Sequence, residues 1–380
     1  MMKIGIECEN LEDPKSRWGI GQVTFNLLKE YVANPEWQKK YKLYLYFKKS
    51  IPKDDLFKIH NSKFKIRILG VNSFNVFYHI LMPLWAMADR LDWMFFPAYQ
   101  LPPLYLGKSI VMLAGDVYYE YKEGSLPFRY RLSYLIFTNW AAKFATKIMA
   151  MSETSKKEVL RLYKIKPEKI FVDYLGVDIK PFFAKSFEGQ QKKDNYLLFV
   201  GQMFPRRHAK ETILAFEKLT TIYSQILKNL RISDLKLILV GPDKYPTKII
   251  DTLVQEINKK FGEEKIIHKE RVGNEELSNL YNGAKALVYV SNRESFGLPP
   301  LEALAFGVQP VIMDNELGQE LFGEFAFYSK SGSVDDIAEA IREALSNDQK
   351  ATSIRNNGPE FVKKYTWQSF AERYFEEFKK

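Results

Sequence analysis

Hydrophobic residues along the chain form short strand-like runs that alternate with amphipathic helical windows. This alternation is typical of parallel sheets whose strands are joined by crossover helices. In the first half of the chain, strands are predicted at Lys3–Glu7, Tyr41–Phe47, Phe64–Leu69, Trp93–Phe96, Ser109–Ala114 and Lys147–Met151. In the second half, they are predicted at Tyr196–Val200, Leu235–Val240, Lys265–Lys269, Ala286–Val290 and Pro310–Met313. Two separate α/β sheets are therefore expected.

The length of the chain, 380 residues, also indicates two domains, because a single core rarely grows beyond about 250–300 residues. A stretch from Gly176 to Asn195 is rich in Lys and Gln and weakly periodic, so it is interpreted as the linker. This predicts a first domain over residues 1–190 and a second over residues 191–364. With 46% hydrophobic residues, both domains can fill a core.

Positive charge is concentrated in the first half of the chain. Residues 1–190 hold 29 Lys and Arg against 19 Asp and Glu, whereas residues 191–380 hold 27 against 27. A basic surface of this kind could attract nucleic acid, anionic lipid headgroups or a phosphorylated acceptor, or could simply be a solvated face. No nucleic-acid-binding motif accompanies the charge, so nucleic acid is not an expected partner.

Three features bear on the cellular location. The only cysteine, Cys8, cannot form an intrachain disulfide, which fits a reducing compartment. The N-terminal residues run straight into the first predicted strand and lack the apolar core of a signal peptide. The apolar stretch Val76–Ala88 is shorter than the roughly 20 residues of a spanning helix, so it is predicted to be a buried or interfacial helix. A cytoplasmic location is expected.

Two glutamates, Glu294 and Glu302, flank a glycine turn and two prolines directly after an apolar run. The run Ala286–Val290 is predicted to be a buried strand, and Leu301–Phe306 a helix with proline in its first turn. Open α/β sheets bind ligands beyond the carboxyl ends of their strands, so both carboxylates and the backbone around Gly297 are candidate ligand contacts. A purely structural role is the alternative, because such residues also form ordinary turns and helix starts.

A glycine pair, Gly19 and Gly21, lies between the first predicted strand and the helical pattern Val23–Tyr31. Glycines at a strand-to-helix turn let a phosphate approach the backbone and the helix N-terminus. The pair lacks the third glycine of a dinucleotide fingerprint, so a tight turn is the alternative.

Two adjacent arginines, Arg206 and Arg207, follow the predicted strand Tyr196–Val200 and precede a helix that starts near Ala209. This position allows them to bind a pyrophosphate through charge-assisted hydrogen bonds of roughly 1.5–3 kcal/mol each. A solvated basic helix start is disfavoured, because cations there oppose the helix dipole.

Together these motifs resemble the retaining glycosyltransferases of family 4. That family has the GT-B fold, an α/β architecture in which two Rossmann-like domains with parallel sheets face each other across a cleft. The resemblance spans nearly the whole chain, and the motifs occur in the expected order. Further matching segments are Met149–Glu153, Leu175–Asp178, Val272–Leu277 and the helix after Tyr365–Trp367. In such folds the closing helix, residues 365–380 here, crosses back onto the first domain.

The resemblance implies that the chain binds a nucleotide-diphosphate sugar as its donor. Glu302 would bind the ribose hydroxyls, Glu294 would lie beside the transferred sugar, and Val272 would line the nucleobase pocket. Gly19 and Gly21 would approach the diphosphate from the other domain. The complete donor-binding set is Gly19, Gly21, Arg206, Arg207, Val272, Glu294, Ser295, Phe296, Gly297, Leu298 and Glu302.

The catalytic residues implied by the resemblance are Glu294, Asp116, Arg206 and Arg207. In the retaining reaction the acceptor hydroxyl attacks from the leaving-group face, and the departing diphosphate can take its proton. The two arginines would stabilise the charge that develops on the diphosphate. Glu294 would position the sugar and support positive charge at the anomeric carbon. No Asp-x-Asp cluster is present, so neither a metal nor another cofactor is expected.

Two positions depart from the family pattern. Gln202 stands where many members have an arginine, so Arg206 would have to supply that charge. Gly115 stands where the family often has a histidine before the aspartate that is retained here as Asp116. The imidazole that would contact the sugar is therefore missing.

The resemblance implies a metal-independent, retaining hexosyltransferase of glycan biosynthesis, with GDP-mannose as a first guess for the donor. The acceptor would be a glycan or a lipid-linked molecule that binds the basic first domain, at the inner face of a membrane. Two alternatives stay open at this point. One is a nucleotide-sugar epimerase with the same fold, and the other is a catalytically silent protein that only binds a nucleotide sugar.

Overall fold

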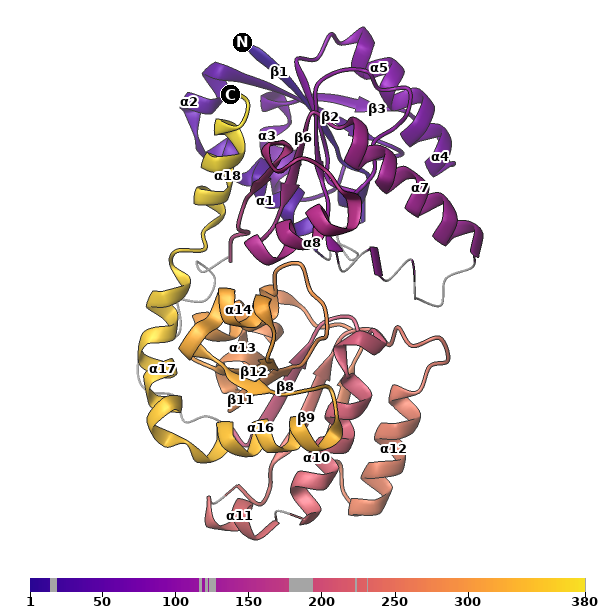
Figure 1. Cartoon of the computed structure of the whole chain (residues 1–380). Helices are drawn as coiled ribbons and strands as arrows, with labels where there is room; N and C mark the ends of the chain where they lie inside the picture. Colours follow the sequence, from indigo (N-terminus) through magenta and orange to yellow (C-terminus); the bar gives the residue numbers. More distant parts are fainter. Residues whose placement is uncertain are drawn as a thin grey trace. The chain divides into compact units, whose positions relative to one another are not determined.

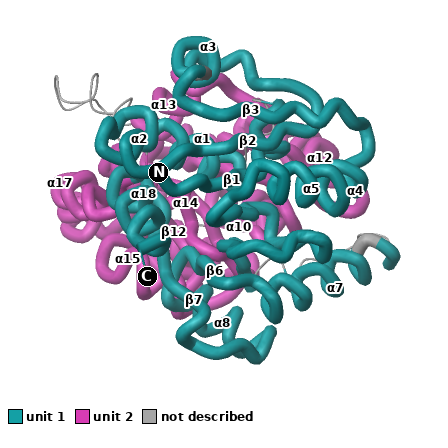
Figure 2. The backbone as a smooth tube through the Cα atoms, turned by 90° about the horizontal axis from the view of Figure 1, so that it is seen from above, with its two compact units in different colours: residues 1–176, 367–380 teal, residues 177–366 magenta. Residues whose placement is uncertain are grey.

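The computed structural model of the chain describes residues 1–13, 19–115, 118–119, 122, 128–177, 194–222, 224–230 and 232–379. They form two compact units, residues 1–176 with 367–380 and residues 177–366 (Figures 1 and 2). The domain boundary predicted at residue 190 falls within residues 178–193, which lie outside the described residues. Each unit is built on one parallel sheet, so the predicted α/β class is confirmed.

The described part of the first unit contains a seven-stranded sheet in the order β3-β2-β1-β4-β5-β6-β7, and all its neighbouring strands are parallel. The strands are β1 (Met2–Glu7), β2 (Tyr41–Phe47), β3 (Lys65–Ile68), β4 (Trp93–Phe96), β5 (Ser109–Met112), β6 (Lys147–Ala150) and β7 (Ile170–Val172). The first six were predicted, with β3, β5 and β6 shorter than expected. Strand β7 was missed.

Helices cover both faces of this sheet, as in a doubly wound fold. They are η1 (Glu9–Leu11), α1 (Ile20–Ala33), α2 (Pro35–Lys40), α3 (Asp55–His60), η3 (Asn61–Lys63), α4 (Phe74–Val76), the π-helix η4 (Phe77–Leu81), α5 (Met82–Ala88), α7 (Phe128–Phe144), α8 (Glu153–Tyr163), η5 (Pro167–Lys169) and α18 (Trp367–Glu376). Strand β4 shows the two faces. Met94 and Phe96 join the core formed with η4, α5 and α7, whereas Phe95 meets Tyr374 of α18 at 5.1 Å between ring centroids.

The closing helix α18 belongs to the first unit, as predicted for the GT-B fold. Its Phe375 stacks on Tyr41 of β2 with ring centroids 4.9 Å apart. In the last turn of α18, Arg373 Nε donates a 2.8 Å hydrogen bond to the buried carboxylate of Asp173, the residue directly after β7. The helix begins at Trp367, two residues after the predicted start, and the chain before it belongs to the second unit.

The described part of the second unit contains a six-stranded parallel sheet in the order β10-β9-β8-β11-β12-β13. The strands are β8 (Tyr196–Val200), β9 (Lys236–Val240), β10 (Ile266–Lys269), β11 (Ala286–Tyr289), β12 (Gln309–Met313) and β13 (Phe327–Ser329). Five of them match the predicted strands within one residue at each end, and β13 was missed. The strand order reverses direction at β8 and β11, which are neighbours although they are far apart in the sequence.

The helices of the second unit flank its sheet on both faces (Figure 1). They are η6 (Pro205–Arg207), α10 (Ala209–Ile222), α11 (Ser224–Asn229), α12 (Ile250–Phe261), α13 (Asn274–Gly283), α14 (Leu298–Ala305), α15 (Glu316–Phe322), η7 (Gly323–Phe325), α16 (Val334–Ser346) and α17 (Asp348–Val362). Helices α13 and α14 enclose one core cluster with β8 and β11. Helix α16 packs on α10 against the other face.

Candidate functional site

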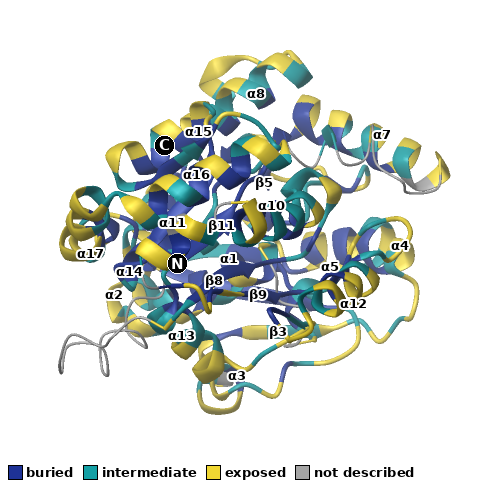
Figure 3. Ribbon diagram, turned by 90° about the horizontal axis from the view of Figure 1, so that it is seen from below, coloured by how far each residue is buried: buried dark blue, intermediate teal, exposed yellow. Residues whose placement is uncertain are grey.

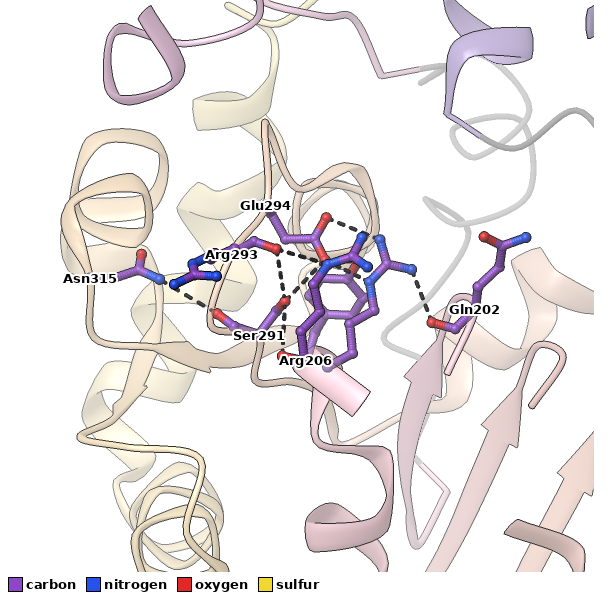
Figure 4. A network of polar contacts seen from close by, with 8 residues as sticks. Gln202, Arg206, Ser291, Arg293, Glu294 and Asn315 are labelled. Atoms are coloured by element: carbon purple, nitrogen blue, oxygen red, sulfur yellow. Dashed lines mark hydrogen bonds and ion pairs between the residues drawn. The ribbon is translucent and has the colours of Figure 1, made fainter. Parts of the chain in front are cut away.

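The loops after β8 and β11 meet at the carboxyl edge of the second sheet. Because the two strands are paired in parallel, their loops leave the sheet side by side. Contacts tie the loops together: Asn292 N donates to the carbonyl of Arg206 at 2.9 Å, and Ser291 Oγ lies 3.3 Å from the same oxygen. Figure 4 shows Ser291 between the Arg206 carbonyl and Glu294. The arrangement brings the predicted arginines of the first loop to the predicted glutamate of the second.

Arg207 and Glu294 form a two-pronged ion pair across these loops. Arg207 Nε lies 2.6 Å from Glu294 Oε1, and Arg207 Nη2 lies 3.0 Å from Oε2. A third guanidinium nitrogen, Nη1, donates to the carbonyl of Gln202 at 3.1 Å. The two side chains are only 15% and 13% exposed, so the pair is largely shielded from solvent. A planar guanidinium held at three points is an oriented donor rather than a swinging charge.

The carboxylate of Glu294 stays ionised in this environment. Burial alone raises the pKa of Glu294, but the charge and hydrogen bonds of Arg207, the charge of Arg206 and a hydrogen bond from Ser291 outweigh it. Its pKa therefore lies below the ordinary value for a glutamate. At neutral pH this side chain is a fixed negative charge, suited to supporting positive charge rather than to donating a proton.

Two further side chains hold Glu294 and were not predicted from the sequence. Tyr289, the last residue of β11, donates its hydroxyl to Glu294 Oε1 at 3.1 Å, and Ser291 Oγ lies 3.1 Å from the same atom. The Tyr289 ring also lies under the Arg207 guanidinium, 5.3 Å from its centroid. Burial raises the pKa of Tyr289, so its hydroxyl remains a donor. The only signal in the sequence is that both residues shortly precede Glu294 at a strand end.

Arg206 occupies a different environment from its neighbour. Its guanidinium lies over the ring of Phe204, 4.5 Å from the centroid, and its Nε donates to the carbonyl of Arg293 at 3.3 Å. Its charge still lowers the pKa of Glu294. The two arginines predicted to act together therefore lie at one site, with Arg207 paired to the carboxylate and Arg206 stacked on an aromatic ring.

His208, which directly follows Arg207, links the two loops. It has the left-handed φ of 46°, and its Nε2 lies 2.9 Å from Asn292 Oδ1. On its other side, Nδ1 lies 3.5 Å from Glu211 Oε2. Burial lowers the pKa of His208. The contacts with Glu211 and Asn292 and the charge of Glu211 raise it by more than burial lowers it, so the pKa lies above the ordinary value for a histidine.

Glu302 is held by a separate contact on α14. Its Oε2 accepts a 2.7 Å hydrogen bond from the hydroxyl of Tyr281, a fully buried residue of α13 that stacks on Phe306. Val272, just before α13, is half-buried and packs on the core cluster that contains Tyr281. Val272 and Glu302, the predicted nucleobase and ribose contacts, thus border the same part of the second unit.

The turn between the glutamates is shaped for backbone contacts. Gly297 has a φ of 113°, a conformation that favours glycine, and it caps α14, which begins at Leu298 rather than at the predicted Leu301. Ser295 and Phe296 are buried, so only their backbone is suited to meet a ligand. Because Pro299 and Pro300, the second and third residues of α14, have no N–H, the backbone N–H groups at this helix start belong to Gly297 and Leu298.

The candidates in the first unit are less defined. Gly19 has a φ of 48° and caps α1, and Gly21 is buried in the first turn of that helix, as expected for a strand-to-helix turn. Asp116 lies outside the described residues. At Gly115, an added Cβ would come within 2.0 Å of a Glu158 carboxylate oxygen and 3.0 Å of its Cβ. The Glu158 side chain therefore fills the space beside Gly115 that a histidine there would need.

None of the helices in the described ranges is long and apolar enough to cross a membrane. Among the same residues, no group of three or more His, Cys, Asp or Glu side chains is arranged to hold a metal ion.

The chain is similar to known sugar-transferring proteins. Residues 182–361 match the family described as glycosyl transferases group 1. The O-antigen chain mannosyltransferase RfbU of Salmonella typhimurium is 26% identical over 249 residues, which cover 64% of this chain and 64% of the relative. The O-antigen chain mannosyltransferase B of Escherichia coli is 27% identical over 233 residues, 59% of this chain and 58% of the relative. The matches thus span about three-fifths of these curated relatives.

A solved structure supports the fold across the whole chain. The structure of Anabaena Alr3699/HepE in complex with UDP-glucose matches with a TM-score of 0.70 at 13% identity and covers 100% of both chains. At this identity the likeness shows the fold alone. The chain therefore has the GT-B fold, and residues 182–361, nearly all of its second unit, are similar to the glycosyl transferases of group 1.

Proposed function

We propose that the chain is a retaining glycosyltransferase of family 4, which moves a hexose from a nucleotide-diphosphate sugar to a glycan or lipid-linked acceptor. The observation that carries the proposal is the shielded Arg207–Glu294 pair, held where the loops of β8 and β11 meet at the carboxyl edge of the sheet. The match to group 1 glycosyl transferases covers this site. Ligands of open α/β sheets bind at such a position, where the strand order reverses.

Mannose is the proposed sugar, with GDP-mannose as the donor. The names of two relatives, both O-antigen chain mannosyltransferases, support mannose. The proposed acceptor, a growing glycan or a lipid-linked sugar, would bind the first unit. The proposed location is cytoplasmic, at the inner face of a membrane.

The site residues would divide the work of the reaction. Glu302 and Val272 would bind the nucleoside, and the donors at the start of α14 would bind the sugar and a phosphate. As the bond between the anomeric carbon and the diphosphate oxygen breaks, Arg206 and Arg207 would stabilise the charge gained by the diphosphate. The acceptor oxygen forms the new bond on the same face of the sugar, and its proton passes to the departing diphosphate.

Glu294 would act beside the anomeric carbon without forming a bond to it. Its lowered pKa and its contacts with Arg207, Tyr289 and Ser291 support a fixed negative charge. Such a charge stabilises a sugar that carries positive charge in the transition state. We also propose that the reaction needs no metal and no cofactor, because the two arginines supply cationic charge at the diphosphate.

One experiment tests the proposal against its alternatives. The purified protein is incubated with GDP-mannose and with other nucleotide sugars, with and without a membrane extract as a source of acceptor, and release of nucleoside diphosphate is measured. Transfer predicts release that depends on the extract, persists in EDTA and falls at least a hundredfold in Arg207→Ala. Arg342→Ala, which alters an ion pair on α16, is the matched control and should be unchanged.

The other outcomes identify the alternatives. Consumption of the donor without extract would indicate an epimerase or a hydrolase. Binding of nucleotide without any release would indicate a silent nucleotide-sugar-binding protein. Either result contradicts the proposal.

A further inference from the structure

Exposed apolar side chains are concentrated in one part of the first unit. Among the described residues, 15 large hydrophobic side chains are exposed, and 11 of these lie between residues 76 and 144. Isolated exposed apolar residues are normal on a protein surface, but gathered ones mark an interaction site. Two helical segments carry most of this group.

The first segment is the continuous helix formed by α4, η4 and α5. Its core-facing side contains the buried residues Phe77, Tyr78, Met82 and Ala86. The other side exposes the α5 stripe, defined here as Val76, Ile80, Leu84 and Met87, at spacings of three or four residues. A solvent-facing helix normally has polar residues on this side. Apart from Asn75 and His79, the exposed side of this helix is apolar although it lies at the surface.

The second segment is α7. The α7 stripe, defined here as Phe128, Leu132 and Ile136, recurs every four residues and therefore lies along one side of the helix. These side chains are 73%, 46% and 56% exposed, although they could have been polar at no cost to the core. The opposite side buries Tyr134 and Ala141. Figure 3 shows that exposed and buried stretches alternate along α7.

The two stripes lie on either side of a contact between η4 and α7. The ring of His79 on η4 stacks on Phe137 of α7, with centroids 4.2 Å apart. Ile80 follows His79 directly and Ile136 precedes Phe137 directly, and both are exposed. The stripes therefore lie on neighbouring helices, and together they are called the apolar face.

The helices that carry the two stripes have no acidic residue. Residues 68–88 contain no Asp, Glu, Lys or Arg, and α7 contains three basic residues, Arg129, Arg131 and Lys143. Trp85, 42% exposed, lies beside the α5 stripe with the Arg67 guanidinium 4.8 Å from its ring centroid. Arg67 is itself paired with the buried Asp89 carboxylate, so the excess of positive charge comes from the basic residues of α7. Exposed Trp and Phe next to basic residues are typical of segments that lie in the headgroup region of a bilayer.

We propose that the apolar face binds the surface of an anionic lipid bilayer, with its two stripes inserted among the headgroups and the basic residues of α7 against the lipid phosphates. Apolar burial supplies the affinity, and each nearby cation adds an attraction to anionic lipid. A second copy of the chain is a poorer occupant, because a two-fold interface would bring the same basic residues of α7 towards each other. The inference deepens, and in that respect rests on, the membrane-side acceptor of the proposed function.

Vesicle sedimentation tests the inference with the full chain. Large vesicles of phosphatidylcholine, alone or with 30% phosphatidylglycerol, are mixed with the wild type and with the double variant Leu84→Glu/Ile136→Glu. The wild type is expected to bind the anionic vesicles at least tenfold more strongly than the neutral ones and to lose most of this preference in 0.5 M NaCl. The double variant is expected to lose at least tenfold in affinity for the anionic vesicles.

Control variants keep the result interpretable. Ile222→Glu changes a 67% exposed apolar side chain on α10 of the second unit and should stay within twofold of the wild type. Arg129→Glu/Arg131→Glu should weaken binding to anionic vesicles only. Far-UV circular dichroism of each variant checks that it is folded. Because the altered side chains are exposed or half-buried, we expect every variant to keep the wild-type spectrum.

Three outcomes would overturn the inference. They are equal binding of wild type and double variant, no preference of the wild type for anionic vesicles, and a wild-type dimer that the double variant converts to a monomer without any change in vesicle binding. Because no donor sugar is present, these outcomes are distinct from a failure of the proposed transfer reaction.

Discussion

Neutralising Glu294 should destabilise the second unit and should do so through Arg207. Two hydrogen bonds join these charged groups, and each contributes about 1.5–3 kcal/mol net. Removing one member of a buried pair costs about 3–5 kcal/mol because the other charge is left shielded from water. With both side chains slightly exposed, we expect about 3 kcal/mol for Glu294→Gln, or roughly 6–12 °C in the melting temperature of a unit of this size.

A double-mutant cycle with Arg207→Met isolates the pair. If the ion pair contributes to stability, the free energy of unfolding of Glu294→Gln/Arg207→Met should be at least about 1.5 kcal/mol higher than the sum of the two single effects predicts. All six tryptophans lie outside residues 177–366, so tryptophan fluorescence reports the first unit, while circular dichroism reports both. Urea unfolding followed by both signals shows which unit is affected. A coupling energy below about 0.5 kcal/mol would refute the reasoning.

Three further changes probe the neighbouring contacts. Tyr289→Phe removes one hydrogen bond to Glu294 and should cost about 0.5–1.5 kcal/mol in urea unfolding and lower kcat more than it changes KM; unchanged kcat would contradict a positioning role. The raised pKa of His208 means that its contribution to stability is fully present below about pH 6.5 and is lost as pH rises through the folded-state pKa. His208→Gln should therefore lower the melting temperature more at pH 5.5 than at pH 8.5, and the reverse order would contradict this. Gly115→His should destabilise the first unit, and adding Glu158→Ala should restore most of the loss; additive effects of the two changes would show that the side chains do not compete for one space.

The strands of both sheets could largely be predicted from the sequence, because buried parallel strands are continuous apolar runs bounded by polar loops. Strands β7 and β13 could not, since three residues are too few to establish a period. The turn around Gly297 and the proline in the first turn of the next helix were also predicted, although α14 begins at Leu298, before the predicted segment Leu301–Phe306.

The contacts inside the candidate site were much harder to predict. Glu294 and Arg207 are 87 residues apart, and they meet only because β8 and β11 are neighbours in the sheet. Strand order is set by long-range packing, which local patterns do not record. Tyr289 looked like an ordinary core residue of β11, and its role became visible only when its hydroxyl was placed at the strand end. Glu158 lies in a helix with no motif, so its position beside Gly115 had no signal in the sequence.

The central claim is that the second unit binds the nucleotide of a sugar donor through the segment from Glu294 to Glu302. Isothermal titration of GDP and GDP-mannose into the wild type, Glu302→Ala and the exposed α16 control Glu343→Ala tests it most directly. The account predicts saturable binding to the wild type and the control, and at least tenfold weaker binding to Glu302→Ala. Equal affinity of all three proteins, or no binding of any nucleoside diphosphate or nucleotide sugar to the wild type, would contradict it.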